Sequence, residues 1–248
     1  PKVQGIAVFC ESRFGCKPLC LEHLQSWSSI KMCFCVVDET VHGLGRRTPL
    51  NADEKEPSGK LSFTVCKPKL ADAGALEKLY DLDYVEAHRN CHGGAAATAS
   101  KELWADALGR IGFDDVIADI AQNGASSPFR LLTCVENKSK AVIGYVLGEL
   151  REKRQKKHRQ FYSELVNIVV REDFRSCGAA KLLFSAFCEE LARSAPTHSG
   201  DVRLYVAEQN KRPTEWYQRL GFKDSGCQAE VMGGEKVLFK RMIKNNQS

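Results

Sequence analysis

The decisive stretch of the chain runs Glu164-Leu-Val-Asn-Ile-Val-Val170, Arg171-Glu-Asp-Phe174, Arg175-Ser-Cys-Gly178-Ala-Ala180 and Lys181-Leu-Leu-Phe-Ser-Ala-Phe-Cys-Glu-Glu-Leu191. The apolar first segment predicts a buried β-strand. The last segment predicts a helix, because its apolar residues recur at helical spacing. The buried face of this helix should carry Leu182, Leu183, Ala186, Phe187 and Leu191.

The turn between this strand and this helix has the features of an anion site. Unpaired backbone N–H groups and the positive end of the helix dipole point at whatever binds a helix N-terminus. Gly178 and Ala180 would let a phosphate approach the backbone closely, and Arg175 adds a positive charge. Taken alone, the same residues also fit a tight turn with a packing glycine.

A second strand and helix follow. Residues 202–206 predict a strand, and Ala207-Glu-Gln-Asn210 leads into a helix that begins near Pro213 and ends at Leu220-Gly221-Phe222. Proline at the start of a helix and glycine at its end follow the usual asymmetry of helix termini.

Together the two segments resemble the GCN5-related N-acetyltransferase (GNAT) superfamily. Arg175, Gly178 and Ala180 match the family's Arg/Gln-x-x-Gly-x-Gly/Ala pyrophosphate motif. Asn210, Tyr217 and Gly221-Phe222 match its second motif in residue type and in spacing. The resemblance covers roughly 60–243 in the order of elements and is specific over 164–222.

The resemblance implies an α/β (α+β) fold with a mixed, mostly antiparallel sheet of six to seven strands flanked by helices. Strands 164–170 and 202–207 should be parallel and splayed apart, with acetyl-CoA as the cosubstrate between them. The pantetheine arm would follow the strand edge, the pyrophosphate would bind the turn, and Asn210 would bind pantetheine or hold the splay open. The implied cofactor-binding residues are Ile168, Val169, Val170, Arg175, Ser176, Cys177, Gly178, Ala179, Ala180, Lys181, Asn210 and Tyr217.

The implied reaction is direct transfer of the acetyl group to a primary amine of a protein lysine, an N-terminus or a small molecule. A backbone N–H near Val169 or Val170 would stabilise the oxyanion. Tyr217 resembles the family's tyrosine that protonates the thiolate, although it could merely pack its helix onto the sheet. Glu164, at the head of its strand, is our candidate general base, and the alternative is a solvated carboxylate. A nucleophilic cysteine is not expected.

The acceptor is less well defined. Residues 206–217 are similar to the corresponding stretch of diamine (spermidine/spermine-type) acetyltransferases. Those enzymes carry an acidic pair where this chain has Val166 and Asn167, so the anchor for a polycation is missing. Two alternatives to this activity stay open: a diamine or polyamine acetyltransferase, and a catalytically silent acetyl-CoA-binding module.

The positive charge of the chain is concentrated in one segment. The formal net charge is +5, and residues 151–159 hold six Lys or Arg against one Glu, so the remainder is neutral. This pattern predicts a basic loop rather than a nucleic-acid-binding face. The loop would be either a solvated hairpin tip or a docking site for an acidic protein or ribonucleoprotein.

The chain divides into an accessory or poorly ordered extension, 1–58, and an acetyltransferase domain, 59–248. The extension holds five of the eleven cysteines, but their spacing fits no zinc site cleanly, so we expect no metal. An odd number of cysteines favours a reducing compartment. We expect a cytoplasmic protein, with the nucleus as the alternative. We expect no membrane association, and the sequence is compatible with a homodimer.

The first half of the domain predicts further elements. We expect a strand over 61–68, then a helix capped by Asp72 with one face formed by Ala75, Leu76, Leu79 and Leu82. A loop over 91–100 should precede a helix over 101–121 that is interrupted near Gly112. Strands over 129–136 and 140–150 should form a hairpin.

Overall fold

The computed structural model describes residues 61–92, 112–154, 159–194, 200–232 and 235–245. Seven strands in this part of the chain are β1 (Phe63–Cys66), β2 (Phe129–Glu136), β3 (Val142–Arg154), β4 (Arg159–Val170), β5 (Val202–Ala207), β6 (Lys223–Met232) and β7 (Glu235–Lys244). The helices are α2 (Ala73–His92), α4 (Phe113–Asn123), α5 (Ala179–Ser194) and α6 (Lys211–Arg219). Three single turns of 3₁₀-helix are η2 (Leu70–Asp72), η3 (Gly124–Ser126) and η4 (Glu172–Phe174).

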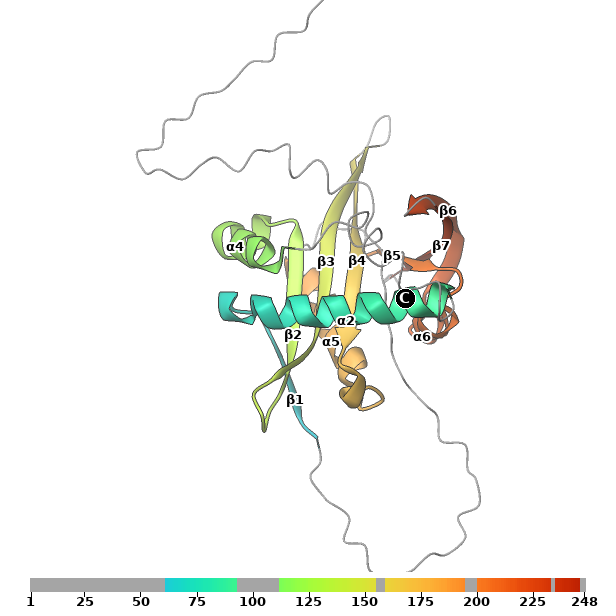
Figure 1. Ribbon diagram of the computed structural model, residues 1–248. Coiled ribbons are helices and arrows are strands. Elements are labelled where there is room, and N and C mark those ends of the chain that lie inside the picture. Colours follow the sequence, from blue (N-terminus) through green and yellow to red (C-terminus); the bar gives the residue numbers. More distant parts are fainter. Residues whose placement is uncertain (1–60, 93–111, 155–158, 195–199, 233–234, 246–248) are drawn as a thin grey trace, which may run out of the picture. The chain divides into compact units, whose positions relative to one another are not determined.

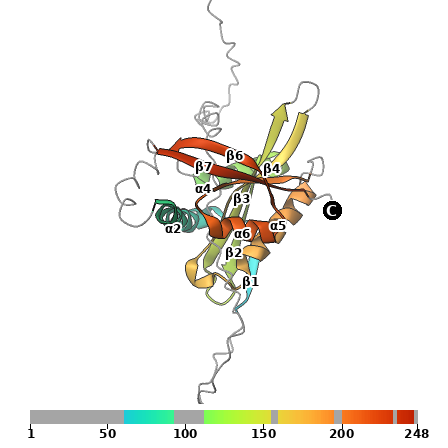
Figure 2. The same cartoon turned by 90° about the vertical axis from the view of Figure 1, so that its right-hand side faces the viewer.

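The strands form one mixed sheet in the order β1-β2-β3-β4-β5-β7-β6. The β4–β5 pair is parallel, and the other neighbouring pairs are antiparallel. Helix α2 lies across one face of the sheet and α5 lies on the other (Figures 1 and 2). This arrangement confirms the predicted mixed, mostly antiparallel sheet flanked by helices.

The two faces of β3 explain how the layers are held. Gly144 and Gly148 face α5 closely, since a Cβ on Gly144 would lie 3.3 Å from the Leu183 side chain and one on Gly148 only 2.3 Å from Phe187. On the opposite face the buried ring of Tyr145 packs edge-on against Phe113 of α4, with ring centroids 5.1 Å apart. Full burial of a large apolar side chain contributes about 1.5–3 kcal/mol, so these contacts fix both helices on the sheet.

Two leucines that we expected in the core are exposed. Leu82 is 64% exposed and Leu182 is 40% exposed. Each residue of a helix turns the side-chain direction by about 100°. Leu82 follows the buried Ala73 by nine residues, so its side chain points to the opposite side of the helix. Helix α5 begins at Ala179, and its buried residues, which include Leu183, Phe187 and Leu191, place Leu182 on the far side.

Residues 151–154 and Arg159 of the basic segment lie in strands, which corrects the predicted loop at these positions, while 155–158 lie outside the described residues. Strand β3 continues to Arg154 and β4 starts at Arg159, with Arg151 opposite Tyr162 in the ladder. The hairpin continues because backbone pairing does not require apolar side chains. The expected extension 1–58 and the predicted structure of 93–111 lie outside the described residues.

Candidate functional site

Strands β4 and β5 meet at one end and then separate. They are paired only at Ser163–Val202 and Glu164–Arg203, while β5 pairs with β7 along its whole length. Beyond Glu164, the edge of β4 through Val170 therefore has no pairing with β5. This wedge, which we call the splay, confirms the prediction from the sequence (Figure 1).

A β-bulge in β4 accounts for the divergence. Leu147 pairs with Asn167 and Gly148 with Leu165, which leaves Val166 as an extra residue. A bulge bends its strand and increases the local twist. Because Val166 follows the last β4–β5 pair by only two residues, β4 bends away at the point where the pairing stops.

The turn from β4 into α5 presents backbone N–H groups on an open side. Gly178 has a left-handed φ of 84°, and Ser176 has a φ of 65°. The first helical hydrogen bond runs from Leu182 N to the Gly178 carbonyl at 3.0 Å. The N–H groups of the three preceding residues therefore lack a partner within the helix. A Cβ on Gly178 would meet nothing within 4 Å, so this backbone is accessible to an anion.

Arg175 shapes this turn as well as charging it. Its Nε donates to the carbonyl oxygen of Val170 at 3.1 Å, which ties the end of β4 to the start of the helix. Ser176, Cys177, Gly178 and Lys181 are exposed, whereas Ala179 and Ala180 are buried. The structure thus brings together all the residues that were predicted to bind the pyrophosphate.

Two buried amides near the splay have unsatisfied atoms. Asn210, which is 3% exposed, has no hydrogen-bond partner for Nδ2 among the described residues. Asn167 of β4 donates from Nδ2 to the Tyr145 hydroxyl at 3.1 Å, but its Oδ1 has no partner there. Buried polar atoms are rarely left unpaired, so these two atoms are available to a water molecule or to a ligand with its own polar groups. An amide-bearing pantetheine arm fits this requirement.

Tyr217 is fully buried on α6. Its ring packs against those of Trp216 and Phe222, with centroid distances of 5.1 Å and 5.5 Å. Glu215 and Arg219 on the same helix are exposed, as expected. The tyrosine is therefore held in a fixed position, whatever its hydroxyl does.

Glu164 does not lie at the head of its strand, and it is not a solvated carboxylate. It lies five residues inside β4 and is only 5% exposed. Its Oε2 is 3.1 Å from Nε of Arg151, and Nη2 of Arg151 is 3.3 Å from Oε2 of Glu149. Arg203, opposite Glu164 in β5, places its guanidinium 4.0 Å from the centre of the Tyr162 ring.

These residues form a polar cluster of two carboxylates, two guanidinium groups and a phenol at the closed end of the splay. Burial, together with the charge of Glu164, raises the pKa of Tyr162. Reasoning from the sequence missed Arg151, which we assigned to the basic loop, and Arg203. The sequence does show polar residues alternating in 149–151 and in 162–164. It does not show the strand register that places these two segments opposite each other.

Comparison with known proteins agrees with this geometry. Residues 96–222 match the model of the Acetyltransferase (GNAT) family, which is just over half of the chain. The chain belongs to this family. The prediction of a GNAT acetyltransferase is thereby confirmed. No curated protein matches the chain in sequence.

Solved acetyltransferases share the GNAT fold of this chain. YncA, a putative acetyltransferase from Salmonella typhimurium, is 18% identical with a TM-score of 0.50, over 74% of this chain and 93% of that one. PaiA N-acetyltransferase from Thermoplasma acidophilum is 15% identical with a TM-score of 0.52, over 74% and 99% of the two chains. NAA60 from Arabidopsis thaliana is 14% identical with a TM-score of 0.53, over 75% and 100%. At these identities the likeness concerns the fold.

Among the residues that the structure describes, no group of three or more His, Cys, Asp or Glu side chains is arranged to hold a metal ion. Within the same residues, no helix combines the length and apolar composition that a membrane crossing requires.

Proposed function

We propose that this GNAT protein is an acetyl-CoA-dependent N-acetyltransferase that moves the acetyl group directly to a primary amine. One observation carries the proposal: the splay opens beside a helix N-terminus whose glycine leaves the backbone uncovered. YncA was crystallised with acetyl-CoA and PaiA with coenzyme A, which supports the same cosubstrate here.

The cofactor would use the backbone more than the side chains. The N–H groups of the turn, residues 175–181, would bind the pyrophosphate, where the helix dipole favours negative charge. The pantetheine amides would pair with the edge of β4 at Ile168, Val169 and Val170, which β5 leaves uncovered. Asn210 would donate from Nδ2 to a pantetheine carbonyl and so satisfy its buried amide.

Acetyl transfer needs a neutral amine, a stabilised oxyanion and a protonated leaving group. Glu164 would take the proton of the amine, directly or through a water molecule, and Arg151 would hold its carboxylate in position. The N–H near Val169 or Val170 would stabilise the oxyanion. Tyr217 would protonate the departing thiolate: a phenol with a pKa of about 10 is only slightly weaker as an acid than a thiol with a pKa of about 8.5. Solvent or the ammonium product would then return a proton to the phenolate.

The polar cluster disfavours a polycationic acceptor. Glu149 and Glu164 are balanced by Arg151 and Arg203, so the closed end of the splay carries no excess negative charge. The acidic pair of diamine acetyltransferases is replaced by Val166 and Asn167. We therefore place the acceptor among protein amines and small monoamines. An acidic protein partner for the basic segment, a homodimer and a cytoplasmic location remain predictions.

The test is thiol release from acetyl-CoA across a panel of amines. The panel contains spermidine, a lysine peptide, a peptide with a free α-amine and a small monoamine. We expect amine-dependent release with at least one monoamine or peptide. Glu164→Gln should lower kcat/KM by about 10²-fold or more without changing CoA affinity. A protein that binds CoA and acetylates no amine, itself included, would be the silent binding module instead.

A further inference from the structure

The ladder between β1 and β2 stops early, and a proline is the reason. Cys66 and Thr133 face each other as a hydrogen-bonded pair of the ladder. Only every second pair of an antiparallel ladder is hydrogen-bonded, so the next hydrogen-bonded pair would be Pro68 and Leu131. Proline has no N–H, so it cannot donate to the Leu131 carbonyl. Strand β2 starts at Phe129 and thus extends past the end of β1.

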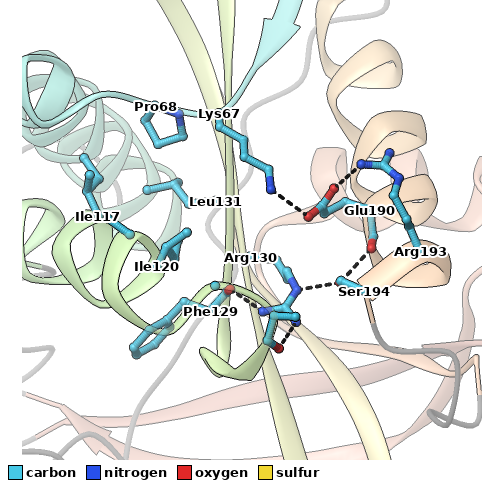
Figure 3. Close-up of a pocket in the computed structure, with 13 residues that line it drawn as sticks. Lys67, Pro68, Ile117, Ile120, Phe129, Arg130, Leu131, Glu190, Arg193 and Ser194 are labelled. Carbon is cyan, nitrogen blue, oxygen red and sulfur yellow. Dashed lines mark hydrogen bonds and ion pairs between the residues drawn. The ribbon is translucent and has the colours of Figure 1, made fainter.

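A cavity of about 490 Å³ lies at this edge of β2, which none of the described strands covers. Its apolar walls come from Ile117 and Ile120 of α4, from Phe129 and Leu131 of β2, and from Pro68 (Figure 3). The volume falls within the range of about 300–1,000 Å³ that is typical of small-molecule sites. The residues that line it include none of those assigned to acetyl-CoA, so it is a separate place in the fold.

The lining of the cavity is positively charged. Among the described residues that line it, Glu190 is the one carboxylate, and it lies 3.4 Å from the Lys67 ammonium and 2.8 Å from the Arg193 guanidinium. Arg130 is a third cation, so the described part of the lining has a net charge of +2. The Lys67 and Arg193 side chains are 64% and 68% exposed, which leaves their charges accessible at the mouth.

Arg130 is occupied by the protein itself. It is buried, and four of its N–H groups donate to Ser194 Oγ and to the carbonyl oxygens of Ala125, Ser127 and Phe129. Burial lowers the pKa of this guanidinium, and the nearby Glu190 opposes that shift. An arginine nevertheless keeps its charge in proteins. Arg130 therefore contributes charge, whereas Lys67 has donors left for a ligand.

A peptide strand does not fit this edge. Because Pro128 and Arg130 point their backbone groups at β3, Phe129 and Leu131 point theirs at the uncovered edge. The Phe129 N–H already donates to Ser127 Oγ at 3.1 Å, and its carbonyl accepts from Arg130 at 2.7 Å. A single remaining residue, Leu131, cannot anchor an added strand, so a small molecule is the better occupant.

We propose that this cavity binds a small amphipathic carboxylate, with an alkyl chain along Ile117, Ile120 and Leu131 and its anionic end at Lys67. The apolar walls suit the chain, and the net positive lining suits the anion. Glu190 opposes the ligand electrostatically, which gives the proposal a distinctive signature. Removing this carboxylate should strengthen binding, whereas removing Lys67 should weaken it.

The experiment titrates octanoate into the full chain by calorimetry, with octylamine as the ligand of opposite charge. We expect saturable binding of octanoate and none of octylamine. Ionic contacts at exposed groups are worth about 0.2–1 kcal/mol, so Lys67→Gln should weaken binding up to about fivefold. Glu190→Gln removes a mostly buried carboxylate and should tighten binding.

Two tryptophan variants locate the ligand. Ala121→Trp projects into the cavity from an exposed position of α4 and should abolish binding. Gln122→Trp, the next residue of the same helix, is exposed and does not line the cavity, so it should bind like the wild type. The proposal is overturned by octanoate that fails to bind, that binds Ala121→Trp unchanged, or that saturating CoA displaces. None of these results bears on acetyl transfer.

Discussion

Replacing Gly178 with aspartate should weaken CoA binding while the fold persists. The structure gives room for the side chain, since a Cβ there meets nothing within 4 Å. The left-handed φ of 84° costs an ordinary L-residue about 1–2 kcal/mol, although Asp and Asn tolerate this region best. A carboxylate at a helix N-terminus is itself favourable by about 0.3–1 kcal/mol, so the net effect on stability should be small.

The effect on the cofactor should be much larger. The new carboxylate would stand about 4 Å from a phosphate charge, where repulsion is about 1 kcal/mol in bulk water and about 4 kcal/mol at the effective dielectric of a protein surface. These limits correspond to CoA binding that is between about fivefold and about a thousandfold weaker. We expect a loss of at least about fivefold relative to Gly178→Asn, which has the same shape and backbone strain but no charge.

Calorimetric titration of CoA into the wild type, Gly178→Asn and Gly178→Asp measures this difference. The gap between the two variants should narrow between low and high salt, because screening weakens interactions between exposed charges. Equal affinities for Asn and Asp would show that no phosphate lies on this turn, and our placement of the pyrophosphate would be wrong.

Four further predictions test other parts of the account. Tyr217→Phe should lower kcat by about 10²-fold or more with CoA affinity unchanged, as measured by steady-state kinetics; normal turnover with an unactivated amine would leave Tyr217 a packing residue. Gly148→Ala should destabilise the fold by about 1–3 kcal/mol in denaturant titrations, because its Cβ would lie 2.3 Å from Phe187; Gly74→Ala, with nothing within 4 Å, should not. Burial, with a smaller contribution from Cys66, raises the pKa of Cys134 to about 12, so this thiol stays protonated at pH 8; iodoacetamide should then modify the exposed Cys177 and Cys227 and spare Cys134, as read by peptide mass spectrometry. Deletion of residues 1–58 should leave a folded CoA-binding protein, and an insoluble product would move the domain boundary.

Local patterns in the sequence predicted the parts of the site that are local in the chain. The strand 164–170, the turn 175–180 and the helix after it are contiguous, so periodicity predicted these elements, although β4 begins earlier, at Arg159. Their role in binding the cofactor was implied only by the family resemblance. The hairpin of β2 and β3 followed from the same kind of signal, with the first strand correct at both ends.

The errors arose where distant residues meet. The environment of Glu164 depends on Arg151 and Arg203, which reach it only through the register of β3 and β5. No periodicity in one strand reveals that register. The cavity is a similar case, because it exists where Pro68 ends one ladder and α4 and α5 flank the exposed edge.

A crystal structure of the protein with bound CoA tests the central claim most directly. The account predicts the pyrophosphate on the N–H groups at 178–181, the pantetheine arm along the β4 edge at 168–170, and a hydrogen bond from Asn210 Nδ2 to the cofactor. CoA bound outside the splay, or strands β4 and β5 paired along their whole length in the complex, would contradict it.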